Sequence, residues 1–148
     1  MSPLRTTLFA LFLCPNVLAA REARADQPVN LALVTPVAIF EESESVTGFR
    51  FNLIYGRNAN LKGLDLGLVN HLTGSVTGIQ WALAANIVGQ NMLGWQAAAV
   101  NIAGGEVTGL QLGLVNIAHQ IRGLQIGLVN VIESGGWLPV MVIVNGHF

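Results

Sequence analysis

A short phrase, Gly-Leu-Gln-x-Gly-Leu-Val-Asn, is repeated along most of the chain. Its clearest copies begin at Gly109 and Gly123. A repeat this short cannot bury a hydrophobic face by itself, so neighbouring copies must pack on one another. The repeat therefore constrains the architecture strongly, although it contains no recognisable reaction centre. Weaker copies precede them at intervals of about 15 residues and begin at Gly48, Gly63, Gly78 and Gly94. A degenerate copy follows at Leu138.

Within each copy, large apolar residues alternate with small or polar ones. In a strand, Leu110, Leu112 and Leu114 share one face, while Gln111 and Gly113 share the other. A period of two is the signature of a β-strand, since a helix would place apolar residues at every third or fourth position. Turn residues recur once per copy and divide the chain into about eight strands of about ten to twelve residues. The sequence therefore predicts an all-β repeat protein.

Two arrangements of these strands fit the pattern, and the first is an antiparallel meander that closes into a small outer-membrane-type barrel. Pairing Leu112 with Ala97 places a turn at Gly104-Gly105, which is a favoured two-residue hairpin turn. The strands have the length of membrane-crossing strands. The C-terminal Phe148 also resembles the terminal aromatic residue of bacterial outer-membrane barrels. In this arrangement we expect Phe148 to act as an assembly signal rather than in binding.

The alternative is a β-solenoid, in which each copy forms one coil. Stacked coils align the glutamines in one row and the asparagines in another, and side-chain amides stack well in such ladders. The spacing of Gln and Asn within a copy resembles that of curli-type amyloid subunits. A repeat unit of one strand, rather than of a hairpin, favours the solenoid. The predicted interior polar row contains Gln80, Gln96, Gln111 and Gln125, and the asparagine row contains Asn101, Asn116 and Asn130.

The beginning of the chain is typical of a secretory signal. Arg5 precedes a short apolar run, and an Ala-Arg-Ala tripeptide ending at Ala25 matches the small-x-small cleavage pattern. The run is too short for a membrane helix and is interrupted by Pro15. We therefore predict a signal peptide at 1–25 and a single all-β repeat domain at 26–148. The expected location is the bacterial outer membrane or cell surface, with the periplasm or secretion as the alternative.

The composition predicts apolar surface on the folded protein. Hydrophobic residues make up 52% of the chain and charged residues 10%, against a usual charged share of about 25%. A small domain with so few charges must direct apolar surface at lipid or at a partner. We therefore expect the partner to be a lipid bilayer or another envelope component. The basic residues after Ala25 form no patch, which argues against nucleic acid; they are Arg50, Arg57, Lys62 and Arg122.

Arg50 and Asp65 lie in neighbouring copies, on the face that also carries the glutamines. A charge on an interior face is costly unless it is paired. We interpret the two residues as a structural interior pair, with a polar constriction or a ligand contact as the alternative. On the same face, Gly113 is expected to be small because Gln96 and Gln125 lie across from it.

No residue pattern indicates catalysis or a bound cofactor. The serines lie in or beside turns, outside any Gly-x-Ser-x-Gly elbow, and the histidines lack metal-ligand spacing. The acidic cluster of Glu41, Glu42 and Glu44 is interpreted as a solvated loop. We therefore expect a protein that is not an enzyme, with no cofactor and no metal.

Several phrases resemble those of a bacterial family of surface-repeat proteins. They are Gly-Leu-Asp-Leu-Gly-Leu-Val-Asn at 63–70, the copies that begin at Gly109 and Gly123, and Arg-Phe-Asn-Leu-Ile-Tyr-Gly at 50–56. The resemblance implies an exported, envelope-associated protein and brings no catalytic residue or substrate. The expected function is a structural or surface-interaction role in the envelope. The alternative is a secreted β-solenoid that binds a surface polymer, a protein partner or itself.

Overall fold

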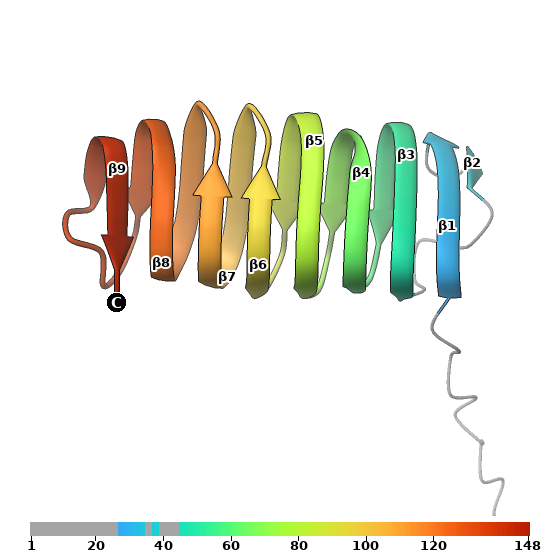
Figure 1. Ribbon diagram of the computed structural model, residues 1–148, viewed down its shortest axis with the longest axis horizontal. Helices are drawn as coiled ribbons and strands as arrows, with labels where there is room; N and C mark the ends of the chain where they lie inside the picture. Colours follow the sequence, from blue (N-terminus) through green and yellow to red (C-terminus); the bar gives the residue numbers. More distant parts are fainter. Residues whose placement is uncertain (1–26, 35–36, 39–44) are drawn as a thin grey trace, which may run out of the picture.

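The computed structural model describes residues 27–34, 37–38 and 45–148, and the chain winds there into a β-solenoid (Figure 1). In this part of the chain nine strands form one sheet, in the order β2-β1-β3-β4-β5-β6-β7-β8-β9. The predicted signal peptide and the acidic cluster at 41–44 lie outside the described residues. The strands are β1 Gln27–Val34, β2 Val37–Ala38, β3 Val46–Asn58, β4 Leu61–Leu72, β5 Val76–Val88, β6 Met92–Ala97, β7 Val100–Leu112, β8 Val115–Ile132 and β9 Val140–His147.

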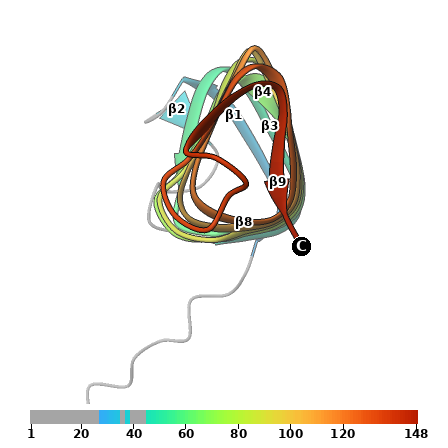
Figure 2. The ribbon, with the colours of Figure 1, turned by 90° about the vertical axis from the view of Figure 1, so that its left-hand side faces the viewer.

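Successive coils are stacked parallel and in register from β1 to β8. Gly94 of β6, for example, pairs with Gly109 of β7. Equivalent residues of neighbouring coils are separated by 14, 15 or 16 positions in the sequence. Viewed along the axis, the coils superpose as a triangle (Figure 2). Antiparallel pairing is confined, among the described strands, to β2 on β1 and β9 on β8.

This topology confirms the all-β repeat and the solenoid alternative, and the antiparallel meander and the barrel are wrong. Ala97 does pair with Leu112, as the meander requires, but the two strands run parallel. A period of about 15 residues brings these two residues together in either arrangement, so the pair cannot distinguish them. The partner of Gln96 does distinguish them, because Gln96 pairs with Gln111 and not with Gly113.

Apolar side chains fill one part of the interior in two stacked columns. In each coil, one column residue lies just before the polar turn and one just after it, as Leu72 and Val76 do. Each residue in the columns is at most 2% exposed. Burying them contributes roughly 25 cal/mol for each Å² of apolar surface removed from water. The first column contains Val46, Leu61, Val76, Met92, Val107 and Ile121, and the second contains Leu72, Val88, Ala103, Ala118 and Ile132.

The glycine that opens each phrase is required by the close approach of the coils. Gly109 has a φ of 138°, a backbone conformation that side chains disfavour. A Cβ placed on Gly109 would lie 2.0 Å from the carbonyl oxygen of Gly94 in the preceding coil. The first residue of the phrase is therefore fixed by the backbone rather than by a ligand.

The C-terminal end of the solenoid is covered by a reversed strand. After β8 the chain turns back as β9, which pairs antiparallel with β8 (Figure 1). The backbone N–H of Trp137 donates to Gly146 O (3.0 Å), and Asn145 Nδ2 donates to Leu138 O (2.7 Å). Phe148 is 83% exposed, and its ring lies 6.2 Å from that of Trp137. The expectation of an assembly signal at Phe148 rested on the barrel and loses its basis with it.

Candidate interaction surface and polar interior

The structure places the interior glutamines in one continuous hydrogen-bonded ladder. All of them are fully buried. Gln125 Nε2 donates to Gln111 Oε1 (2.8 Å), and Gln111 Nε2 donates to Gln96 Oε1 (2.8 Å). Gln96 Nε2 donates in turn to Gln80 Oε1 (2.9 Å), and Gln80 Nε2 donates to Asp65 Oδ2 (2.9 Å). Every amide in this glutamine ladder therefore donates toward the N-terminal coils.

The asparagines form a second ladder that donates in the opposite direction. Asn70 Nδ2 donates to Asn86 Oδ1 (3.0 Å), and the same bond continues through Asn101 and Asn116 to Asn130. The amide groups also reach backbone carbonyls at the corner of each coil, as in the bond from Asn101 Nδ2 to Leu112 O (2.7 Å). Asn70 and Asn86 extend the row predicted from the sequence. Together the two ladders satisfy most of the polar groups that they bury, which would otherwise be costly. Gln125 Oε1 and Asn52 Oδ1, at the ends of the ladders, have no hydrogen-bond partner among the described residues.

Arg50 and Asp65 are paired directly in register at the N-terminal end of the glutamine ladder. Both side chains are 0% exposed. Arg50 Nε donates to Asp65 Oδ1 (2.8 Å), and a terminal nitrogen donates to Oδ2 (2.7 Å), so the contact is bidentate. Another terminal nitrogen donates to Asn58 Oδ1 (3.1 Å). The guanidinium therefore ends the ladder with a compensated charge, and the pair lies inside the coil rather than at an opening.

In β3 an Asn and a Gly stand in the reverse order from those in β4. Asn52 is in register with Gly67. Gly56 occupies the position in register with Asn70. The side chain of Asn52 fills the space, because a Cβ on Gly56 would lie 1.7 Å from Asn52 Oδ1. From there Asn52 Nδ2 donates to Asn70 Oδ1 (3.0 Å). The asparagine ladder thus begins from a different position in the sequence, which the repeat pattern alone does not reveal.

Gly113 is enclosed by different neighbours from those expected. A Cβ on Gly113 would lie 2.4 Å from Ala98 O and 2.7 Å from Asn101 Nδ2. Gln96 and Gln125 are not its neighbours, because both lie in the glutamine ladder, in register with Gln111. The residue must therefore be small, but because of the preceding coil and the asparagine ladder.

The outward side chains on one side of the triangle are apolar from β3 to β8. Those on a second side are apolar in the later coils, while Arg57 and His71 occupy the outer column in β3 and β4. The first apolar face consists of two stacked columns, Phe49, Leu64, Ile79, Trp95, Leu110 and Leu124, and Phe51, Leu66, Trp81, Ala97, Leu112 and Ile126. The second apolar face consists of Val69, Ala85, Val100, Val115 and Val129, and Ile87, Ile102, Ile117 and Val131. These positions are exposed or half-buried.

The two apolar faces meet at a corner that we name the leucine edge. Backbone hydrogen bonds stack this corner from coil to coil, as in Leu114 N to Ala99 O (2.9 Å). Leu83 at the edge is 68% exposed. The edge consists of Leu53, Leu68, Leu83, Ala99, Leu114 and Leu128.

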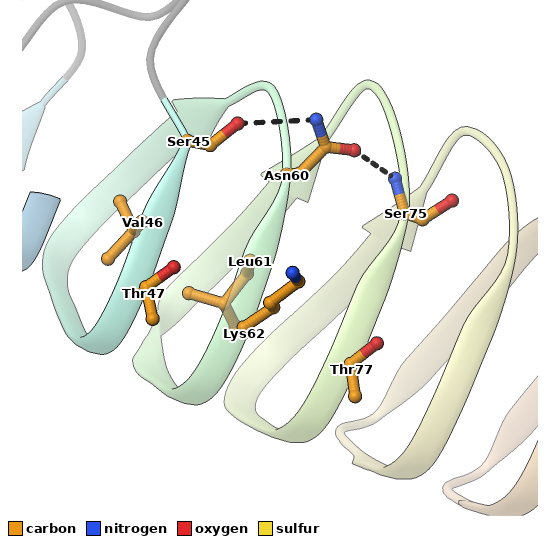
Figure 3. A pocket seen from close by; sticks show the side chains of 8 residues that line it. All are labelled: Ser45, Val46, Thr47, Asn60, Leu61, Lys62, Ser75 and Thr77. Atoms are coloured by element: carbon orange, nitrogen blue, oxygen red, sulfur yellow. Dashed lines mark hydrogen bonds between the residues drawn. The ribbon is translucent and has the colours of Figure 1, made fainter. Parts of the chain in front are cut away.

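The rest of each coil, between the far ends of the two apolar faces, carries a polar strip. Figure 3 shows its first coils, where Asn60 Nδ2 donates to Ser45 Oγ (3.3 Å) and Asn60 Oδ1 accepts from the backbone N–H of Ser75 (2.8 Å). Thr47, Lys62 and Thr77 line the same shallow hollow. The strip continues as Asn91, Glu106 and Gln120, with Leu93, Thr108 and Arg122 beside them. Arg122 Nε pairs with Glu106 Oε1 at 3.0 Å.

The described residues contain no group of three His, Cys, Asp or Glu side chains that could hold a metal ion. The same part of the chain has no helix of the length and apolar character needed to cross a membrane. Comparisons with known protein families, curated proteins and solved structures gave no match. The described residues show two features that bear on function, the polar interior and the apolar exterior.

Proposed function

We propose that the protein is an exported, non-enzymatic component of the bacterial cell envelope. It acts by binding a partner through its own apolar surface. One observation carries this proposal: the first apolar face runs from β3 to β8 and joins, at the leucine edge, the second apolar face, whose outer column is apolar from β5 to β8. Soluble monomers rarely expose apolar patches larger than a few hundred Å². A surface of this kind is typical of interaction sites.

The interior supports a binding or structural role. The glutamine and asparagine ladders connect each coil with the next by side-chain hydrogen bonds. Parallel backbone pairing adds a second connection between the same coils. Such a framework holds its outward columns in fixed positions, which suits a docking surface. The signal predicted at 1–25 supports export.

Cell fractionation tests this proposal. The full chain, expressed in a bacterium with two membranes, should be recovered in the envelope fraction with its N-terminus immediately after Ala25. A variant with Leu83→Asn, Leu114→Asn and Leu128→Asn should move to the soluble fraction, because these substitutions make the leucine edge polar. Leu93→Asn is the control, since Leu93 is also exposed, at 52%, but lies beside the polar strip.

Two results would overturn the proposal. One is recovery of the wild-type protein in the soluble fraction or in the medium, which would favour the secreted solenoid that binds a polymer, a protein or itself. The other is equal retention of the wild type and the triple variant in the envelope.

A further inference from the structure

We infer that the partner of the apolar surface is a lipid bilayer, and that the solenoid lies flat on it with the leucine edge inserted. This inference rests on the proposed function, because it names the partner of the same surface. The axis of the solenoid would then run parallel to the membrane plane. The polar strip would face water.

The shape of the surface favours lipid over a protein partner. In cross-section the coils form a triangle (Figure 2). The two apolar faces follow one another in each coil and are separated only by the leucine edge, so the apolar surface wraps around a corner. A second copy packed flat against one face leaves the other face in water. A rigid protein would need a groove that matches the whole corner. A fluid apolar phase covers both faces at once without such a groove.

The side chains on the surface also suit a bilayer boundary. Trp81 and Trp95 project from the middle of the first apolar face and are 53% and 58% exposed. Tryptophan prefers the zone between headgroups and acyl chains, because its ring is apolar and its N–H remains hydrated. Beyond this face, Lys62 and Arg122 occupy equivalent outward positions beside the polar strip. Basic groups there would lie at headgroup level.

The charge distribution about the axis is that of an amphipathic element. Along the leucine edge and the first apolar face, the described residues include no charged side chain, and on the second side Arg57 lies at the N-terminal end of the outer column. Asp65 is buried, and Glu106 lies in the polar strip in contact with Arg122. An amphipathic helix with this division lies in the membrane interface with its apolar face buried. The solenoid presents the same division on a rigid scaffold.

Flotation with protein-free vesicles tests the inference. The exported full chain would be mixed with phosphatidylcholine vesicles, with or without phosphatidylglycerol, and centrifuged through a density gradient. The wild type should float with the vesicles. The triple variant at Leu83, Leu114 and Leu128 should bind at least about tenfold more weakly, because removing apolar burial worth about 1.4 kcal/mol changes the partition by that factor. Leu93→Asn should bind like the wild type.

A measurement on the intact edge makes the test independent of the triple variant's folding. In a Trp137→Phe protein the remaining tryptophans are Trp81 and Trp95. Their fluorescence should shift to shorter wavelength on vesicle binding and should be quenched by brominated acyl chains. Absence of flotation, absence of quenching, or a stable dimer that excludes vesicles would overturn the inference. Envelope recovery that requires the leucine edge, combined with no binding to protein-free vesicles, would leave the proposed function standing and assign the surface to a protein.

Discussion

Asp65 accepts the side-chain amide of Gln80, and this single bond sets the direction of the glutamine ladder. The distance from Gln80 Nε2 to Asp65 Oδ2 is 2.9 Å. An ionised carboxylate can only accept hydrogen bonds, so Gln80 must turn its NH₂ group toward it. The carbonyl of Gln80 then faces the next coil and accepts from Gln96 (2.9 Å). Each following glutamine has the same orientation, with its NH₂ group toward the preceding coil, so all bonds of the ladder run in one direction.

Breaking the charge pair by removing one partner should therefore destabilise the protein. Asp65→Asn leaves the buried guanidinium of Arg50 without its counter-ion, and we expect the free energy of unfolding to fall by about 3–5 kcal/mol. Urea unfolding followed by circular dichroism measures this loss. A change below about 1 kcal/mol would contradict the assignment, since exposed ion pairs contribute no more than that.

The same reasoning predicts that the pair is replaceable as a unit. The double variant Arg50→Gln, Asp65→Gln extends the glutamine ladder by two members and leaves no buried charge. We expect the double variant to be more stable than Arg50→Gln alone or Asp65→Gln alone, because replacing both partners of a buried ion pair is often neutral. A double-mutant cycle on the free energies of unfolding tests the coupling. If the two single losses simply add in the double variant, the two side chains are not coupled.

Within the ladder, Gln111 should contribute through both of its polar groups. Gln111→Leu leaves Gln96 Oε1 and Gln125 Nε2 without their side-chain partner. Gln96 Oε1 is then buried without a partner, whereas Gln125 Nε2 keeps its bond to Val131 O (3.0 Å). A buried unsatisfied group costs about 1–3 kcal/mol, and we expect a loss in this range. Gln120→Leu is the control, because Gln120 is exposed in the polar strip and should change stability by less than about 0.5 kcal/mol. Equal effects of the two substitutions would contradict the ladder.

Strand formation was predictable from the sequence, but strand direction was not. Alternation assigns Leu112 and Gln111 to opposite faces, whichever way the neighbouring strand runs. A repeat with one strand per period also brings Ala97 beside Leu112 in both parallel and antiparallel stacks. The terminal Phe148 pointed to the barrel, although a single aromatic residue at the end of the chain carries little topological information.

Two parts of the interior could not be predicted from the repeated phrase. Apolar core residues such as Leu61 and Leu72 lie between the copies, where turn residues dominate the pattern. The exchange of Asn52 and Gly56 is a compensation in space, since the side chain of one fills the position of the other. A search for identical residues at equivalent positions finds no Asn at position 56. It does not reveal that the side chain of Asn52 occupies that space.

Gly113 should not tolerate a larger residue. A Leu side chain there would enter the space of Ala98 O and the amide of Asn101. We expect Gly113→Leu to lower the free energy of unfolding by about 1–3 kcal/mol or more, as overpacking does. Even Gly113→Ala should destabilise the protein, because the nearest atom is a backbone oxygen at 2.4 Å and not the end of a flexible side chain. Thermal unfolding of both variants decides this, and an unchanged midpoint for Gly113→Leu would show that the corner is loosely packed.

Phe148 should contribute little to stability, in contrast to the buried end of the second core column. Its ring is 83% exposed and contacts Trp137 at a centroid distance of 6.2 Å. We expect Phe148→Ala to cost no more than about 0.5–1.5 kcal/mol, which is the range for an aromatic pair. Ile132 is 1% exposed, and Ile132→Ala should cost about 2–5 kcal/mol. Chemical unfolding of the two variants side by side gives the comparison. A larger loss for Phe148→Ala than for Ile132→Ala would mean that the aromatic contact, and not the core column, holds the C-terminal coil closed.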